Sequence, residues 1–277
     1  MNELTILLIG CGKMGSSLLE GLVKSENFDG TVDIIEPALK DSLKEEFRKS
    51  KVNFYSDIKE NKDTIAYDLI IVATKPNIYK EIFNDLKNNL IINDKTLIIS
   101  ILAGIRINKI EEIVGSFPII RAMPNIAASA FEGMTALIGN KKITNKDILN
   151  IDLIFELIGE KIWLENEIQM DSFTAISGSG PAYFFFFTEC LKNIAIEEGF
   201  TEDIANKISK QIIIGSGKLV KDSGIDPKEL RENVTSPNGT TEAALKILIG
   251  NETGLLDKLR QAILEAKKRS KEISDNS

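Results

Sequence analysis

The sequence predicts an α/β domain built on a parallel sheet, followed by an all-helical C-terminal domain. In the first half, short apolar runs such as residues 4–10 and 67–76 alternate with charged helical stretches. That alternation is typical of βαβ units. From about Glu165 onward, β-branched runs give way to long stretches with helical periodicity. We therefore expect one domain over residues 1–164 and a second over residues 165–277.

The individual elements follow from the same periodicities. Strands are expected in the apolar runs at 4–10, 31–37, 67–76, 95–104, 117–125, 134–139 and 161–164. Helices are expected at about 14–24, 39–49, 146–158, 181–199, 202–224, 241–250 and 255–273. The basic cluster Lys267–Lys271 is interpreted as a solvated last helical turn that complements the helix dipole.

Composition excludes several kinds of partner and compartment. The 277 residues carry a net charge of −7 and no strong basic cluster, so we expect no nucleic-acid partner. No apolar run approaches the length of a membrane span, so no membrane partner is expected either. Two cysteines cannot build a disulfide scaffold and suit a reducing compartment, which predicts a cytoplasmic protein.

The chain contains no histidine. Histidine is the usual proton-transfer group near neutral pH, so its absence excludes Ser-His-Asp hydrolases and Cys-His proteases. Histidine-ligated zinc enzymes are excluded for the same reason, and no metal site is expected. Any chemistry here must need no strong acid–base residue or must use another group.

A glycine-rich motif follows the first expected strand. The residues Gly10, Cys11, Gly12, Lys13, Met14 and Gly15 form a G-x-G-x-x-G pattern. Alone, the pattern is also compatible with a purely structural turn. Here it links the first strand to a helix within a βαβ series, which favours a Rossmann-type NAD(P)-binding domain with the pyrophosphate at the helix N-terminus.

Glu36 ends the second expected strand, 21 residues after Gly15. A carboxylate at this place accepts hydrogen bonds from the adenosine ribose and repels a 2′-phosphate, which favours NADH over NADPH. The alternative is that Glu36 only caps the strand beside Pro37, and the nearby Lys40 weakens the inference.

Three further loops follow apolar runs at the same edge of the expected sheet. Ligands of open α/β sheets bind beyond the carboxyl ends of the strands, so these loops are candidate cofactor contacts. The residues are Ala73, Thr74, Lys75, Pro76, Ile101, Leu102, Ala103, Pro124 and Asn125.

A second unusual stretch, Ser236–Thr241, lies in the helical half. Ser-Pro-Asn-Gly is strong turn chemistry, and Thr240 and Thr241 then open a helix. A turn that feeds a helix N-terminus can bind an anion such as a carboxylate, although a simple threonine cap is the plainer interpretation.

At this point the chain resembles a known family. "ISGSGPAYFFFFTE" with "NVTSPNGTTEAAL" closely resembles the paired signatures of pyrroline-5-carboxylate reductases. The elements "IGCGKMG", "VATKPN", "SILAG" and "RAMPN" match that family's loops in the same order, so the resemblance spans nearly the whole chain. It implies NAD(P)H-dependent reduction of 1-pyrroline-5-carboxylate to L-proline, the last step of proline synthesis.

The resemblance also implies roles for individual residues. The substrate loop falls on Ser236, Asn238, Gly239, Thr240 and Thr241, whose backbone amides would hold the carboxylate. Thr241 matches the catalytic threonine whose hydroxyl reaches the ring nitrogen. Further residues match positions that line the substrate pocket or the adenosine end of the cofactor, namely Asn233, Glu167 and Asn61.

Two residues depart from the family pattern. Asn238 replaces the first glycine of the usual Ser-Pro-Gly-Gly loop, and asparagine tolerates the left-handed conformation that the turn needs. Glu36 stands where NADPH-preferring members tend to carry a small or basic residue, which puts the usual cofactor preference in doubt.

The implied chemistry suits a chain without histidine. A protonated cyclic imine is already electrophilic, so positioning two reactants in a dry pocket can replace a strong general acid. A β-hydroxyacid dehydrogenase would need a lysine after the glycine-rich turn at 178–180, and none occurs before Lys192. A non-catalytic dinucleotide sensor remains a further alternative.

The run Phe184–Phe187 completes the expectations. We expect the turn of small residues Ser177–Gly180 to begin a helix whose N-terminal end faces the active site. Four consecutive residues about 100° apart cannot share one helix face, so this helix must be buried nearly all round. We expect a second subunit to cover it, and the resemblance likewise implies a dimer or a larger assembly of dimers. Full burial within one subunit is the alternative.

Overall fold

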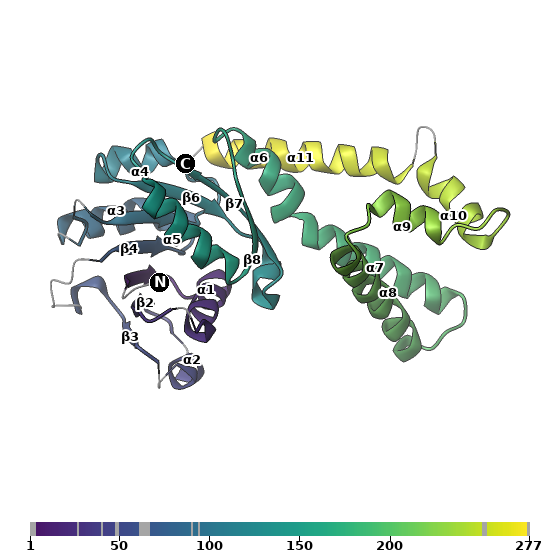
Figure 1. Cartoon of the computed structure of the whole chain (residues 1–277), viewed down its shortest axis with the longest axis horizontal. Helices are drawn as coiled ribbons and strands as arrows, with labels where there is room; N and C mark the ends of the chain where they lie inside the picture. The colour runs from purple at the N-terminus through teal and green to yellow at the C-terminus, as the bar shows by residue number, and fades with distance from the viewer. Residues whose placement is uncertain are drawn as a thin grey trace. The chain divides into compact units, whose positions relative to one another are not determined.

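The computed structural model describes residues 4–26, 28–39, 41–47, 50–60, 67–89, 91–93, 95–250 and 254–275 (Figure 1). The chain forms two compact units. The first comprises Met1–Gly178 together with Lys267–Ser277, and the second comprises Ser179–Ala266. The boundary expected at residues 164 and 165 rests on the change of sequence pattern and stays a prediction.

The first unit is built on a twisted α/β sheet. Its strands, in the described part of the chain, have the spatial order β3-β2-β1-β4-β5-β6-β7-β8. They are β1 (Thr5–Ile9), β2 (Thr31–Ile35), β3 (Val52–Tyr55), β4 (Leu69–Val72), β5 (Leu97–Ser100), β6 (Ile119–Met123), β7 (Gly133–Gly139) and β8 (Gly159–Trp163). Neighbouring strands pair in parallel except β6 and β7, which are antiparallel. Strand order reverses at β1 and β4, which is where open α/β sheets bind their ligands.

Helices cover both faces of this sheet. They are α1 (Lys13–Lys24), α2 (Asp41–Glu46), α3 (Tyr79–Asn88), α4 (Ile107–Val114), α5 (Asn145–Glu156) and α6 (Gln169–Phe173). Short 3₁₀ turns lie at Ile58–Glu60, Pro76–Ile78 and Ile126–Ala130. Alternate residues of β1 enter two separate cores: Leu8 packs with Leu19 of α1, and Leu7 with Phe83 of α3. The parallel sheet is thus buried on both sides, as its near-continuous apolar strands require.

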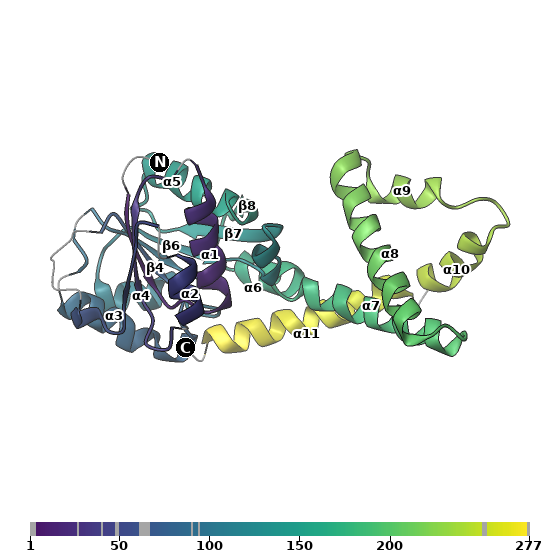
Figure 2. The same ribbon diagram turned by 90° about the horizontal axis from the view of Figure 1, so that it is seen from below.

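The second unit is all helical. It holds α7 (Gly180–Glu197), α8 (Glu202–Ser223), α9 (Pro227–Asn233), α10 (Thr240–Ile249) and the first part of α11 (Leu255–Asp275). Figure 2 shows the connection from α9 to α10 as an extended stretch of chain. Within the described residues, no helix combines the length and apolar character needed to cross a membrane.

Two expectations about helix ends are wrong. The small-residue run was expected as a turn, but helical backbone continues from α6 through a π-helical turn, Thr174–Gly178, and Ser179 (φ −85°, ψ −18°) into α7. Pro181 is compatible with this path because it lies in the first turn of α7, and the Ser177 carbonyl that an amide at 181 would reach accepts from Asn125 instead. The cluster Lys267–Lys271 is likewise not a last turn, since α11 continues to Asp275 and its last turn carries no basic residue.

Candidate active site

The three glycines of the motif occupy three different environments. Gly10 has φ +91°, and a Cβ there would lie 2.7 Å from the Ala73 carbonyl oxygen. A Cβ on Gly15 would collide with the carbonyl oxygen of Gly10. Gly12 is exposed, and no heavy atom lies within 4 Å of where its Cβ would be. Gly10 and Gly15 are therefore needed for the turn and for packing, while Gly12 leaves open space at the start of α1.

That open space faces an uncapped helix end. Gly12 is the N-cap of α1, no side chain caps it, and the first turn carries no acidic residue. The first amides of a helix have no partner within the helix and bear partial positive charge. A helix start of this kind binds anions in other proteins, and a dinucleotide pyrophosphate at this loop stays a prediction.

Glu36 is tied to this loop. Its Oε2 accepts a hydrogen bond from the backbone amide of Cys11 at 2.9 Å, and its Oε1 accepts one from the amide of Ala38 at 3.1 Å. Burial and, secondarily, the Glu36 carboxylate raise the pKa of the Cys11 thiol to about 12. A fixed carboxylate thus stands where the second strand ends, next to the first amides of the glycine-rich loop.

A cleft of about 560 Å³ opens at the carboxyl ends of the strands. Six of the predicted cofactor residues line it: Gly10, Gly12, Glu36, Ala73, Thr74 and Lys75. The remaining predicted cofactor residues that the structure describes lie outside this lining, namely Cys11, Lys13, Met14, Gly15, Pro76, Ile101, Leu102, Ala103, Pro124 and Asn125. Asn61 lies outside the described residues.

Other lining residues were not singled out in the sequence. They come from the loop after β3 and from α3 and the turn before it, and they include Ser56, Asp57, Asn77, Glu81 and Asp85. The sequence pattern could have indicated them, because the loops after β3 and β4 leave the sheet at the same edge as the loop after β1. Four carboxylates and one ammonium group, that of Lys75, line the described part of this cleft.

The side chain of Asn125 forms hydrogen bonds with other protein groups. Its Nδ2 donates to the carbonyl oxygen of Ser177 at 3.1 Å and approaches the Ser177 hydroxyl at 3.3 Å. Its Oδ1 accepts from the amide of Met134 at 3.3 Å. Asn125 thereby ties the end of β6 to the π-helical turn, a feature that often marks functional sites.

Glu167 is also held by protein groups in the first unit. Its Oε1 accepts from Nη1 of the buried Arg121 at 2.8 Å and from the amide of Ile107 at 3.0 Å. The carboxylate therefore caps the N-terminus of α4 while it neutralises Arg121. A role of Glu167 in the substrate pocket stays a prediction.

In the helical unit, Ser236–Thr241 forms the predicted turn into α10. Asn238 has φ +59°, the left-handed conformation that its replacement of glycine was expected to allow. The amide of Gly239 donates to the Ser236 carbonyl at 3.0 Å, and the amide of Asn238 donates to Oε2 of Glu242 at 2.7 Å. The first-turn amides of Thr240 and Thr241 remain without partners inside the helix. The amides of Asn238 and Gly239, which were expected to help hold a carboxylate, are thus already engaged by protein oxygens, and a role of Thr240 and Thr241 stays a prediction.

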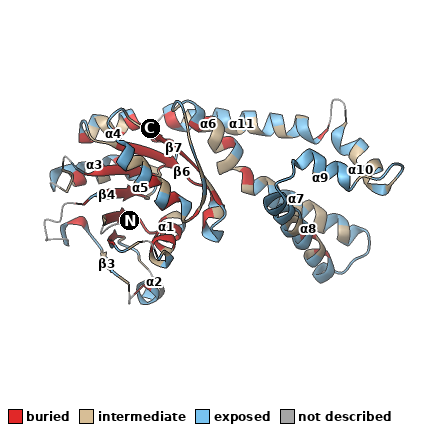
Figure 3. Ribbon diagram, viewed as in Figure 1, coloured by how far each residue is buried: buried red, intermediate tan, exposed pale blue. Residues whose placement is uncertain are grey.

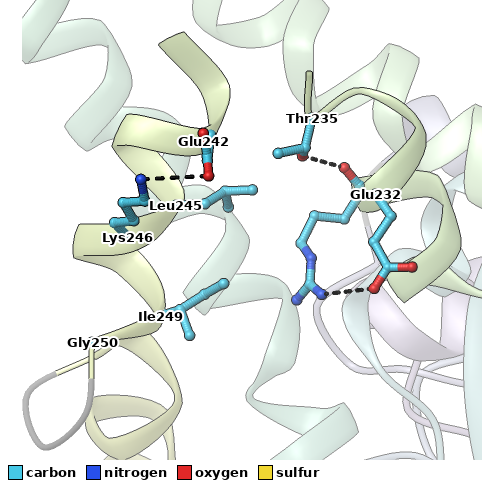
Figure 4. Close-up of a pocket in the computed structure, with 8 residues that line it drawn as sticks. Glu232, Thr235, Glu242, Leu245, Lys246, Ile249 and Gly250 are labelled. Carbon is cyan, nitrogen blue, oxygen red and sulfur yellow. Dashed lines mark hydrogen bonds and ion pairs between the residues drawn. The ribbon is translucent and has the colours of Figure 1, made fainter. Parts of the chain in front are cut away.

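A hollow of about 450 Å³ lies between α9 and α10 (Figure 4). Its charged groups are already paired, Arg231 with Glu232 at 3.7 Å and Lys246 with Glu242 at 3.4 Å. The Asn238 amide first, and Lys246 second, hold the pKa of the Glu242 carboxyl below its ordinary value. The predicted Asn233 is exposed and does not line this hollow.

Comparisons with known proteins cover the whole chain. Residues 167–273 match the family model for pyrroline-5-carboxylate reductase dimerisation. Residues 5–104 match the model for NADP oxidoreductase, coenzyme F420-dependent. The chain is 34% identical to pyrroline-5-carboxylate reductase from Methanosarcina acetivorans, over 99% of each chain.

The chain belongs to the pyrroline-5-carboxylate reductase family. The Pseudomonas aeruginosa enzyme is 32% identical, over 99% of this chain and 98% of the relative. Among solved structures, the Coxiella burnetii reductase matches with a TM-score of 0.88 at 30% identity, over 99% of both chains. The Plasmodium falciparum pyrroline carboxylate reductase, solved with NADP bound, matches with a TM-score of 0.81 at 30% identity, also over 99% of both.

This membership confirms the predicted α/β fold with its helical C-terminal region. It favours neither the non-catalytic sensor nor the β-hydroxyacid dehydrogenase. Lys192, the first lysine after the turn at 178–180, lies in α7 and forms an ion pair with Glu202 at 2.7 Å.

Proposed function

We propose that this protein reduces the C=N bond of 1-pyrroline-5-carboxylate with NAD(P)H to give L-proline. The observation that carries the proposal is the pairing of two anion-binding features in one chain: the open N-terminus of α1 at Gly12 and the turn into α10 at Ser236–Thr241. The first suits the cofactor pyrophosphate and the second suits the substrate carboxylate.

Positioning supplies most of the catalysis. When bound, NAD(P)H would supply the hydride for the carbon of the protonated imine, whose ring nitrogen keeps its proton in the product. The amides of Thr240 and Thr241 hold the carboxylate, while the Thr241 hydroxyl orients the ring nitrogen. Asn233 and Glu167 complete the pocket that the family resemblance implies. No residue must titrate near neutral pH, which agrees with a chain without histidine.

The cofactor is held by residues on the first unit and is preferentially NADH. The glycine-rich loop, Gly10–Gly15, receives the pyrophosphate, and Glu36 accepts from the ribose hydroxyls. Four carboxylates in the lining of the cleft make a 2′-phosphate unfavourable, since like charges repel across a few ångströms. The strand-end loops at Ala73–Pro76, Ile101–Ala103 and Pro124–Asn125, together with Asn61, make the remaining cofactor contacts.

The helical unit self-associates. Phe184–Phe187 are 40–66% exposed in the single chain, which is unusual for four consecutive large apolar side chains. A second copy of the chain covers them in a dimer or a larger assembly of dimers. Two unpaired cysteines, Cys11 and Cys190, agree with a reducing, cytoplasmic location.

Cofactor oxidation with 1-pyrroline-5-carboxylate tests the activity and the preference together. We expect turnover with both cofactors and a higher kcat/KM with NADH. Glu36→Gln should shift the NADH:NADPH ratio of kcat/KM toward NADPH by about tenfold, because one charge is removed. Glu132→Gln, an exposed change away from the cleft lining, is the control. An unchanged ratio would remove Glu36 from cofactor selection, and no turnover at all would refute the activity.

The role of Thr241 has its own matched pair. Thr241→Val removes the hydroxyl and keeps the shape, and Thr241→Ser keeps the hydroxyl. Valine should lower kcat by at least about tenfold at unchanged NADH affinity, while serine should retain most of the activity. Equal rates for the two variants would contradict the proposed role.

A further inference from the structure

The last turns of α11 pack within the first unit. Residues from Lys267 onward belong to the same compact unit as the sheet, although the rest of α11 belongs to the helical unit. The buried Asp171 of α6 accepts a hydrogen bond from the Ser270 hydroxyl at 2.7 Å and a longer one, 3.5 Å, from Ser274. Ser274 itself is only 3% exposed. A buried carboxylate thus receives two hydroxyls from one face of α11.

The same turns of α11 contact the loop after β5. Nη2 of Arg106 lies 2.8 Å from Oδ1 of Asp275. A Cβ on Gly104 would lie 2.6 Å from Cγ2 of Ile273, and Gly104 has φ +79°. The loop can therefore pass this close to Ile273 only because residue 104 lacks a side chain.

The loop is fixed from another direction as well. Arg106 is the N-cap of α4, and the next amide, that of Ile107, donates to Glu167. Glu167 is in turn held by the buried Arg121 of β6. Two carboxylates four residues apart in the chain, Glu167 and Asp171, thus anchor the start of α4 and the end of α11.

We propose that Ser270, Ile273, Ser274 and Asp275 of α11 position the cofactor loop Ile101–Gly104. This inference rests on the proposed cofactor contacts of that loop. None of the α11 side chains touches a reactant; they act by fixing the backbone of residues 101–106. Hydride transfer is sensitive to the placement of the nicotinamide, so loosening this loop reduces cofactor affinity and rate.

A matched pair of variants tests the proposal in the full-length protein. Asp275→Asn weakens the contact to Arg106, whereas Glu272→Gln makes the same chemical change in a side chain that pairs with Arg269 on α11. Since the Arg106–Asp275 pair is partly exposed, Asp275→Asn should lower kcat/KM for the cofactor by about threefold. Glu272→Gln should leave it unchanged, and Asp275→Glu should restore it.

The double variant Ser270→Ala with Ser274→Ala leaves the Asp171 carboxylate without these two donors. It should raise the dissociation constant for NADH, measured by nicotinamide fluorescence, by about tenfold. It should also speed hydrogen exchange in the 101–107 segment. If this double variant does not fold, the Asp275 and Glu272 pair decides the question alone.

The outcomes are separable. Changes in thermal unfolding with unaltered NADH affinity, kinetics and exchange at 101–107 would make α11 a purely structural clamp and overturn the proposal. NADH affinity and hydrogen exchange need no turnover, so the positioning role can be tested even if 1-pyrroline-5-carboxylate is not reduced. In that case the proposed function is refuted, while NADH affinity and hydrogen exchange still decide whether α11 positions the loop.

Discussion

The sheet unit and the helical unit differ in how far they bury their phenylalanines and other large apolar side chains (Figure 3). Phe83 and Phe155 are fully buried between sheet and helices, whereas Phe184–Phe187 on α7 are largely exposed in the single chain. The first unit completes its core from its own sequence. The second presents an apolar surface that a second polypeptide must cover to remove it from water. Substitution of Phe83 or Phe155 should therefore change the free energy of unfolding, whereas substitution within Phe184–Phe187 should change the free energy of association.

The largest expected effect is in the sheet unit. Phe83→Ala deletes a fully buried ring from the core beneath α3 and should cost about 3–5 kcal/mol of unfolding free energy. Chemical denaturation monitored by circular dichroism measures this loss. A cost below about 1 kcal/mol would mean that this core tolerates a cavity far better than its packing indicates.

Phe185→Ala should act on association instead. Its ring is 66% exposed in the single chain, so the change should weaken the dimer by about 2 kcal/mol and leave the sheet core intact. Sedimentation over a range of protein concentrations measures the dissociation constant. Glu160→Ala, an exposed polar change on β8 of the sheet unit, is the control. Unaltered association would place the interface elsewhere on the helices.

Two glycines sharpen the comparison within the first unit. Gly12→Ala fits the open space and the ordinary φ of −71°, so folding should be retained while the NADH dissociation constant rises by about tenfold. Gly15→Ala collides with the Gly10 carbonyl and should lower the thermal midpoint as well. Thermal unfolding and nicotinamide fluorescence of the two variants separate packing from ligand binding, and identical behaviour would contradict this division.

The smallest effect concerns the turn into α10. The pKa of Glu242 is held below its ordinary value of 4.5, mainly by the Asn238 amide. Its contribution to the turn is therefore complete above pH 4.5 and is lost as the pH falls through the lowered pKa. Glu242→Gln should abolish this acid-dependent step and leave the turn slightly looser at pH 7. Hydrogen exchange at Asn238 between pH 3 and 7 measures it, and an identical profile in both proteins would contradict the assignment.

The sequence predicted those features of the fold and site that depend on neighbouring residues. The glycine-rich loop, Glu36 beside it, and the left-handed Asn238 all lie where local rules placed them. The expected role of the turn at Ser236–Thr241 came from the family resemblance. Composition and spacing alone could not distinguish a substrate loop from a simple helix cap.

What the sequence did not predict depends on contacts between distant segments. The turn expected at Ser177–Gly180 is part of a continuous helical path, and Asn125, 52 residues earlier, donates a hydrogen bond to its π-helical turn. The two serines that contact Asp171 lie 99 and 103 residues beyond it, and nothing in their own neighbourhood marks them. The elements β3, α3, α4 and α9 were also not predicted. Four to seven residues carry little periodicity, which explains β3 and α9 but not α3, whose ten residues bury Tyr79, Phe83 and Leu86.

The environment of Cys11 has a chemical consequence for a protein whose cofactor carries electrons. With a pKa of about 12, this thiol is protonated at neutral pH, and only the thiolate reacts readily with peroxides and alkylating reagents. Burial and the neighbouring Glu36 therefore make the Cys11 thiol a poor nucleophile at neutral pH, although it lies in the glycine-rich loop.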